Sequence, residues 1–140
     1  MSVEVASPTD IDQRIEVIRR RDAYETDPAT FLEHWGREDA ALRDRIVAAK
    51  GRIGSVEVPD ASLRACAELC VALGADGLRG ELTLLRTARA LAAFEGVEAV
   101  GVDEVRAVAP SALRHRLRRD PLDEAGSTAR VMRVIAEVLG

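Results

Sequence analysis

Apolar residues recur at three- and four-residue spacing in six segments of this chain, and glycine or proline stands at the ends of most of them. Such spacing gathers the apolar side chains on one face of a helix, while glycine and proline mark helix ends. The predicted helices cover residues 10–24, 28–50, 59–73, 78–95, 103–119 and 131–139. The sequence therefore predicts an all-α fold, a helical bundle of about six helices.

Composition agrees with a bundle of closely packed helices. The 140 residues fit one domain, and they are 47% hydrophobic but only 3% aromatic. The core must then be built from Ala, Leu, Val and Ile, which allow helix axes to approach closely. The residues predicted to face this core are Ile11, Ile15, Ile18, Phe31, Trp35, Leu42, Ile46, Ala49, Leu63, Cys66, Cys70, Leu73, Leu78, Leu82, Leu85, Ala92, Val105, Val108, Ala112, Leu113, Leu117, Val131, Val134, Ile135, Val138 and Leu139.

Capping and helix-breaking residues define the ends of these helices more closely. Thr9 is predicted to cap the first one, and Gly74 and Gly96 to stop the third and fourth. Pro110 lies inside the fifth, where a proline removes a backbone hydrogen bond, so a kink or a restart is expected there. Residues 97–102 are predicted to form a short extended link.

The first residues read differently, because Ser2 to Val5 alternate polar and apolar side chains like a half-buried strand. No comparable second strand follows to pair with it. The segment is therefore either a frayed tail or a short orphan strand whose sheet belongs to a preceding domain.

The charge balance argues against two classes of protein. The formal net charge is −4, so no basic field favours nucleic acid as a partner. No apolar run is long enough to span a bilayer and no signal peptide is recognisable, so a cytoplasmic location is expected. Lys50 is the only lysine among many arginines, which is typical of a GC-rich bacterial genome.

Catalytic machinery is not recognisable in the sequence. There is no G-x-x-x-x-G-K-[ST] phosphate loop and no acidic pair at the end of an apolar strand to hold Mg²⁺. His34 and His115 have no partners in a catalytic pattern. Cys66 and Cys70, one helical turn apart, are interpreted as buried small side chains, with a redox pair as the alternative and metal binding disfavoured for want of further ligands. No catalytic residue and no metal ligand is therefore predicted, and this chain alone is not expected to be an enzyme.

Arg79 is the strongest candidate for a binding role. It follows Asp76-Gly77 and precedes Gly80 in the first turn of a predicted helix. A planar guanidinium beside the exposed N–H groups of a helix end suits a phosphate oxygen, although an ordinary solvated or ion-paired arginine fits the same pattern.

A second arginine cluster comprises Arg114, Arg116, Arg118 and Arg119 around His115. It lies near the end of a predicted helix, where positive charge is stabilised by the helix dipole. It is either a solvated run or a subunit-contact patch that faces acidic residues of a neighbour.

Two motifs together resemble one family. Gly77-Leu78-Arg79-Gly80-Glu81-Leu82 opens an Ala-rich helix, and Leu113-Arg114-His115-Arg116-Leu117-Arg118-Arg119-Asp120-Pro121 follows some thirty residues later. Both resemble the helical lid of the magnesium chelatase ATPase subunit, a AAA+ family. The resemblance implies that Arg79 senses the terminal phosphate of ATP bound to its own or a neighbouring core.

The same resemblance implies a place for the whole chain. Residues 1–7 would be the remnant of the last strand of a AAA+ core, and residues 8–140 the lid. ATP and Mg²⁺ would be cofactors of the full-length protein, with none expected for this chain alone. The implied partners are its own AAA+ core, neighbouring subunits of a hexameric ring, a D-type AAA+ subunit and a large porphyrin-binding subunit.

The implied activity is ATP-driven insertion of Mg²⁺ into protoporphyrin IX for bacteriochlorophyll synthesis. Two alternatives stay open at this point. One is a stand-alone helical adaptor for other proteins, and the other is a lid from another member of the same ATPase clade. The match across residues 113–124 favours the chelatase over that second alternative.

Overall fold

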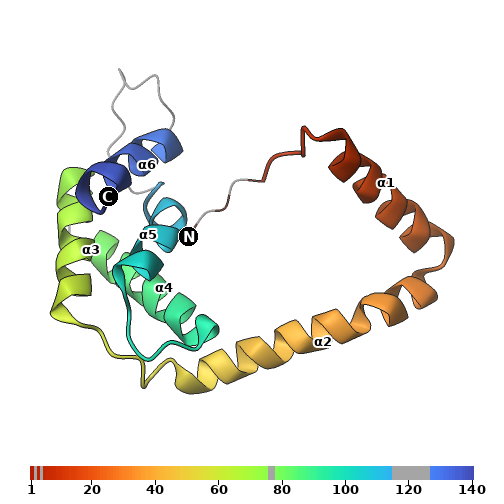
Figure 1. Ribbon diagram of the computed structural model, residues 1–140, viewed down its shortest axis with the longest axis horizontal. Helices are drawn as coiled ribbons and strands as arrows, with labels where there is room; N and C mark the ends of the chain where they lie inside the picture. Colours follow the sequence, from red (N-terminus) through yellow and green to blue (C-terminus); the bar gives the residue numbers. More distant parts are fainter. Residues whose placement is uncertain (2, 4, 76–77, 115–126) are drawn as a thin grey trace. The chain divides into compact units, whose positions relative to one another are not determined.

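The computed structural model describes residues 1, 3, 5–75, 78–114 and 127–140 of the chain, and six helices lie within this part (Figure 1). They are α1 (Ile11–Thr26), α2 (Pro28–Arg52), α3 (Asp60–Ala72), α4 (Arg79–Glu95), α5 (Val102–Leu113) and α6 (Ser127–Val138). The predicted all-α fold is confirmed. No helix in these ranges combines the length and the apolar character needed to cross a membrane.

The chain divides into two compact units. One comprises residues 4–47, and the other comprises residues 1–3 and 48–140, so the boundary falls within α2. The second unit holds the buried core. There α4 packs along α5, and α3 and α6 contact each other and α5 (Figure 1).

Small and aliphatic side chains fill this core, as the composition predicts. Its largest fully buried members include Leu69, Leu73, Leu84 and Leu113, each with no measurable exposure. The buried set that was predicted from spacing and is confirmed comprises Ala49, Cys66, Cys70, Leu73, Ala92, Val105, Val108, Ala112, Leu113, Val131, Val134, Ile135 and Leu139. Leu85 and Val138 pack against the core while partly exposed.

The inward face of α4 differs from the prediction. Its buried row is Gly80, Leu84, Ala88 and Ala92, at four-residue spacing. Leu78 and Leu82 are exposed, because positions two residues from this row point to the opposite side of the helix. The sequence pattern predicts that Leu78 and Leu82 face the core, whereas close helix packing buries a row made mostly of Gly and Ala.

Leu63 on α3 was also predicted to face inward and is 44% exposed. Ser62, the residue before it, is buried instead, and its hydroxyl donates a hydrogen bond to the carbonyl of Val100. This polar anchor sets the rotation of α3, so that the adjacent Leu63 turns toward the surface.

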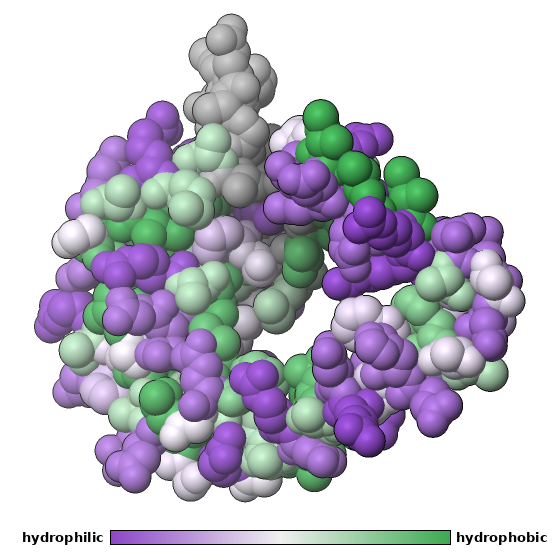
Figure 2. Space-filling model, turned by 45° about the vertical axis from the view of Figure 1, so that its right-hand side comes forward, coloured by the Kyte–Doolittle hydropathy of each residue, from purple (hydrophilic) through white to green (hydrophobic). Residues whose placement is uncertain are grey.

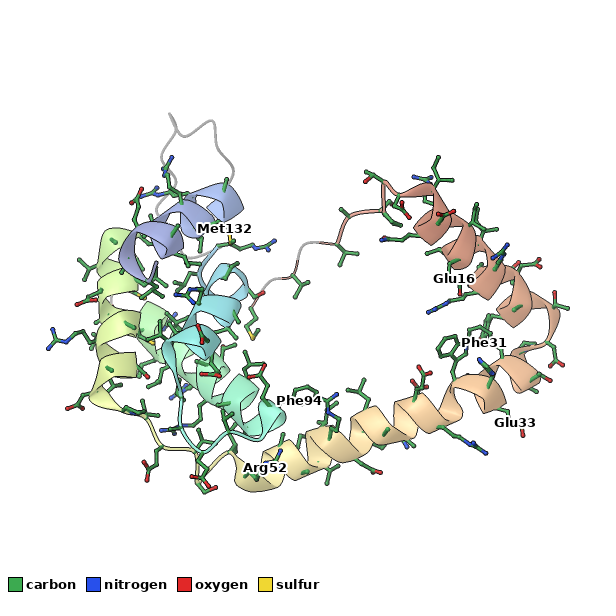
Figure 3. All side chains as sticks on the ribbon, in the orientation of Figure 1. Glu16, Phe31, Glu33, Arg52, Phe94 and Met132 are labelled. Atoms are coloured by element: carbon green, nitrogen blue, oxygen red, sulfur yellow. The ribbon has the colours of Figure 1, made fainter. Side chains whose placement is uncertain are left out.

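The ends of α2 and α4 are joined by one side chain. Arg52 donates two hydrogen bonds to the carbonyl of Ala93, 3.2 Å from Nε and 2.7 Å from Nη2, and Figure 3 shows it near the end of α4. Gly96 ends α4 in the left-handed conformation at φ 81°, as its position predicted, and Gly74 follows α3 at φ 64°.

The link predicted at residues 97–102 is extended for part of its length. Ala99 forms a parallel bridge with Glu57, whose N–H donates to the carbonyl of Glu98 at 2.8 Å. Glu57 in turn accepts a bond of 3.0 Å from the N–H of Val100, which is buried. The bridge ties the segment before α3 to the segment before α5.

Pro110 does not divide α5, and the restart that was considered is wrong. The helix runs from Val102 to Leu113 with Pro110 inside its last turn. A proline there forfeits a single backbone bond, and the buried neighbours Ala109 and Ala112 hold the turn in place. Leu117, predicted to continue this face, lies outside the described residues.

The unit of residues 4–47 has no such core. No side chain of α1 is buried, and Ile11 and Ile18 are 72% and 67% exposed. In α2 the one buried residue is Ala49, which belongs to the other unit, so the predicted burial of Leu42 and Ile46 is wrong. Hydrophobic residues accordingly appear among hydrophilic ones on the surface shown in Figure 2.

Asp10 caps α1 in place of the predicted Thr9. Its carboxylate accepts a 2.9 Å hydrogen bond from the N–H of Gln13. Before it, residues 1, 3 and 5–9 have no regular secondary structure, while Ser2 and Glu4 lie outside the described residues. The orphan strand at residues 2–5 and the boundary after residue 7 therefore remain predictions.

Candidate functional site

Arg79 is the first residue of α4, and its side chain is exposed. Its guanidinium has no hydrogen-bond or ion-pair partner among the residues that the structure describes. Its carbonyl accepts a 2.8 Å hydrogen bond from the Thr83 hydroxyl. The exposed side chain of Arg79 is accessible from solvent.

The backbone around Arg79 adds further donors. The first hydrogen bond of the helix runs from the N–H of Leu82 to the carbonyl of Leu78, at 3.1 Å. Leu78 occupies the N-cap position, and its apolar side chain makes no capping hydrogen bond. The N–H groups of Arg79, Gly80 and Glu81 have no acceptor within the helix. A helix start of this kind with an exposed guanidinium is a suitable binding surface for a phosphate.

The opposite side of this first turn faces inward. Gly80 is buried, and a Cβ added to it would lie 3.3 Å from Cβ of Ala75, 3.4 Å from Sγ of Cys70 and 3.8 Å from Cδ2 of Leu113. One carboxylate oxygen of Glu81, Oε2, is also buried and has no hydrogen-bond partner. The turn thus presents Arg79 outward while Gly80 holds it close to α3.

Cys66 and Cys70 lie on α3 beneath this turn, buried and free, as interpreted from the sequence. Burial, with a smaller contribution from the charge of Glu81, raises the pKa of the Cys66 thiol to about 11 and that of Cys70 to about 12. Such thiols stay protonated at neutral pH, and they are poor nucleophiles and metal ligands.

The arginine cluster is described only at its beginning. Arg114 donates from Nε to the carbonyl of Pro110 at 3.4 Å, so its side chain turns back on its own helix. Arg116, Arg118 and Arg119 lie outside the described residues, as does His115. A subunit-contact role for these four arginines remains a prediction.

Two grooves were not predicted from the sequence. In one, side chains of α1 and of the start of α2 enclose about 590 Å³, with Phe31 visible in Figure 3. There Arg20 lies 4.5 Å from the ring centroid of Trp35. Phe31, which also lines the groove, meets the ring of Tyr24 edge to face at 5.6 Å. The nearby aromatic residues Phe31 and Trp35, in a chain that is only 3% aromatic, were the signal that could have indicated this groove.

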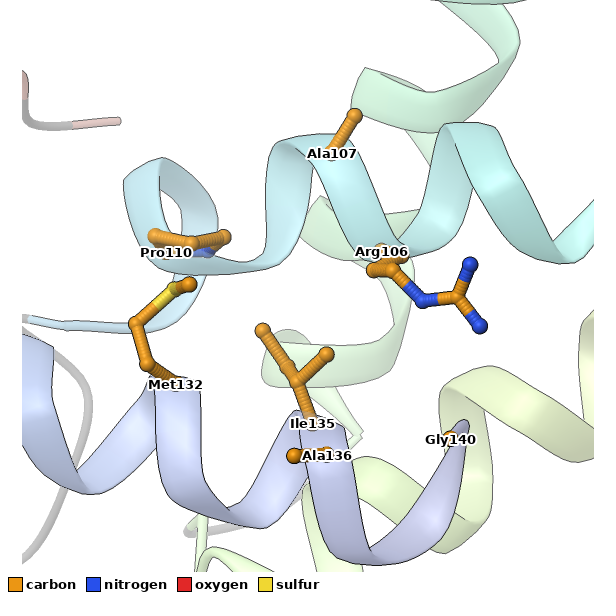
Figure 4. A pocket seen from close by; sticks show the side chains of 7 residues that line it. All are labelled: Arg106, Ala107, Pro110, Met132, Ile135, Ala136 and Gly140. Carbon is orange, nitrogen blue, oxygen red and sulfur yellow. The ribbon is translucent and has the colours of Figure 1, made fainter.

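The other groove lies between α5 and α6 and also encloses about 590 Å³. Figure 4 shows Pro110 and Met132 on its two sides, with Arg106 at one end. Arg106 donates to the carboxylate of Asp103 at 2.7 Å and to the carbonyl of Leu139. Arg106 thereby holds the end of α6 against α5.

Metal-binding residues do not gather in the described part of the chain, where no three His, Cys, Asp or Glu side chains lie close enough to hold an ion.

Comparison with known proteins places the helices around Arg79 in a known family of domains. Residues 63–135, which include all of α4 and α5, match the family model of the AAA lid domain. The chain is 61% identical over 139 residues to the magnesium-chelatase 38 kDa subunit of Rhodobacter capsulatus, covering 99% of this chain and 40% of that protein. The subunits of the same name from Cereibacter sphaeroides and Chlorobaculum tepidum are 61% and 40% identical, over 99% and 100% of this chain and 42% and 36% of theirs.

These comparisons confirm the resemblance on which Arg79 was singled out. The chain spans only about 40% of the length of the curated relatives that it matches. The family match covers more than half of the chain and includes the whole helix that begins with Arg79. The chain belongs to the AAA lid domain family.

Proposed function

We propose that this chain is the lid of a magnesium chelatase ATPase subunit and that Arg79 senses the terminal phosphates of ATP. The single observation that carries the proposal is the exposed guanidinium of Arg79 at the start of α4, which has no partner among the described residues. The relatives named as magnesium-chelatase subunits support the assignment to this complex. They do not favour the stand-alone adaptor.

In this role the chain's own contribution is binding and orientation. The guanidinium and the N–H groups of the first turn would contact phosphate oxygens of a nucleotide held by a AAA+ core. Loss of the terminal phosphate removes the charge that Arg79 contacts, and the lid is then free to change its position.

ATP with Mg²⁺ is the nucleotide of the proposed complex, and the Mg²⁺ ligands come from the core. The partners are that core and neighbouring subunits of a hexameric ring, and beyond them a D-type AAA+ subunit and a large porphyrin-binding subunit. Their joint reaction is insertion of Mg²⁺ into protoporphyrin IX in chlorophyll or bacteriochlorophyll synthesis. In this scheme Mg²⁺ is also a substrate.

A chimera provides the test. This chain replaces the matching segment of the Rhodobacter capsulatus subunit, to which it is 61% identical, and ATP turnover is measured for the chimera and for its variant Arg79→Ala. Turnover should fall by about 10- to 100-fold, the value of about one charged hydrogen bond to phosphate. Arg79→Lys should restore only part, because lysine lacks the planar fork.

Arg86→Ala is the matched control, since Arg86 is exposed on the same helix. It should leave turnover within about twofold, as expected for an exposed charge away from the phosphates. Equal turnover by the parent chimera and by its Arg79→Ala variant would exclude the sensor role and leave the domain a structural module.

A further inference from the structure

The position of Arg79 depends on how closely the start of α4 approaches α3. Three glycines lie within helices of the described chain, namely Gly36, Gly51 and Gly80. A Cβ added at Gly36 or Gly51 would meet nothing within 4 Å, whereas at Gly80 it would meet two atoms at 3.3 and 3.4 Å. Gly80 is therefore the glycine among these three whose missing side chain permits a close contact.

The side chains at the first turn itself do not anchor it. Leu78, at the N-cap position, makes no side-chain capping hydrogen bond, and the guanidinium of Arg79 has no partner among the described residues. Below the turn, the N–H of Ala75 donates to the carbonyl of Cys70 at 3.0 Å, so both atoms that Gly80 approaches belong to one closed turn at the end of α3. The packing of Gly80 on this turn sets the distance between the start of α4 and the end of α3.

Gly80 and Arg79 are adjacent in sequence but lie on different faces of α4. Successive residues of a helix are rotated by about 100°, so an inward Gly80 places Arg79 toward the surface. A Cβ at residue 80 would require the neighbouring atoms of Ala75 and Cys70 to give by a few tenths of an ångström. To the extent that the packed end of α3 does not give, the start of α4 moves instead, and the base of Arg79 moves with it by a similar amount.

We infer that Gly80 is a positioning residue, whose contact with Ala75 and Cys70 holds Arg79 where it can reach the nucleotide. The inference rests on the proposed function of Arg79. It predicts that a substitution at residue 80 weakens ATP binding without lowering the stability of the fold. Alanine favours a helix over glycine by about 1 kcal/mol, which offsets the close contact, so the fold tolerates it. In the same variant Arg79 is displaced and loses its contact with the phosphate.

The experiment uses the chimera described above and measures its Kd for ATP and for ADP together with its urea midpoint. Gly80→Ala should weaken ATP binding by about three- to tenfold, because a small misplacement is costly at a phosphate contact. ADP binding and the midpoint should change little. Gly51→Ala, the same chemical change at an open position, should alter none of the three.

A double variant that moves the methyl group from residue 75 to residue 80 tests whether ATP binding is rescued. In Gly80→Ala combined with Ala75→Gly, the nearest methyl moves from one side of the contact to the other, and the ATP affinity should return toward that of the parent. If Gly80→Ala does not fold, Ala75→Gly alone, which loosens the same contact without a clash, should weaken ATP binding selectively.

The outcomes separate the two proposals. If Arg79→Ala weakens ATP binding while Gly80→Ala and Ala75→Gly do not, Gly80 has no positioning role and the sensor role stands. If Arg79→Ala has no effect, the proposed function fails and the role of Gly80 fails with it. A loss of ATP and ADP affinity in equal measure for Gly80→Ala would show general damage and would overturn the inference.

Discussion

At the scale of single residues, Arg79 carries a positive charge where the helix dipole already places partial positive charge. Among the described residues no acidic side chain pairs with it, so no ion pair within them offsets this unfavourable position of the charge. A residue that opposes local stability and faces solvent is one that a ligand can use.

Because the charge of Arg79 is unfavourable at the start of a helix, a neutral residue at this position should stabilise the chain. Arg79→Gln keeps a similar helix propensity but removes the unfavourable charge, so the free energy of unfolding of this chain should rise by about 0.3–1 kcal/mol. Urea unfolding measures it, with Arg86→Gln near the middle of α4 as a control that should change little. A loss of stability on Arg79→Gln would reveal a structural partner for the arginine.

The two cysteines give a second prediction at this scale. Since burial raises their pKa from 9.0 to about 11 and about 12, a thiol reagent at pH 8 should react with neither in the folded chain and with both after denaturation. Rapid reaction of the folded chain would contradict their burial.

The same thiols make stability depend on alkaline pH. Below pH 9 they are protonated in both the folded and unfolded states, and their contribution is fully present. Above pH 9 the unfolded chain releases protons that the folded chain keeps, so the free energy of unfolding falls as pH rises toward about 11 to 12. Replacing both thiols by alanine should flatten this part of the pH profile.

At the scale of helices, two glycines should respond oppositely to alanine. Gly96 ends α4 at φ 81°, where a Cβ costs about 1–2 kcal/mol, so Gly96→Ala should lower helix stability. Gly36 lies inside α2 with nothing within 4 Å of an added Cβ, so Gly36→Ala should raise it by up to about 1 kcal/mol. Thermal melting followed by circular dichroism measures both, and equal effects would contradict the assigned helix ends.

The helices themselves were largely predictable, because their ends carry local signals. Proline at the start of α2 and glycine after α3 and α4 act through their own backbones, so neighbouring elements hardly affect them. Helix faces were predicted less well. Leu78 and Leu82 look like core residues in the sequence, but the close approach of α5 to α4 selects Gly80, Leu84 and Ala88.

For the candidate site, the sequence was sufficient to predict that Arg79 lies at the start of a helix, since the flanking glycines and the Ala-rich segment are local signals. Its role remains a proposal. The contact of Gly80 with Ala75 and Cys70 was not predictable, because it depends on the distance between α3 and α4. The hydrogen bonds from Arg52 to Ala93 could not be predicted for the same reason, as they join residues that are 41 positions apart.

At the scale of the whole chain, the buried side chains of the described residues all lie in one of the two units. The core lies within residues 48–140, whereas α1 buries no side chain. Hydrogen exchange of this chain should therefore show α1 exchanging quickly and α4 and α5 slowly, because amide protection follows buried contacts. Equal protection of α1 and α4 would indicate a core that includes both units.

Whether this lid senses the terminal phosphate is decided by the ratio of ATP to ADP affinity in the chimera, with and without Arg79. If Arg79 contacts the terminal phosphate, Arg79→Ala should weaken ATP binding by about 10- to 100-fold and leave ADP binding nearly unchanged. If the variant binds both nucleotides as the parent does, or loses both equally, Arg79 does not sense the terminal phosphate and the account of this lid is wrong.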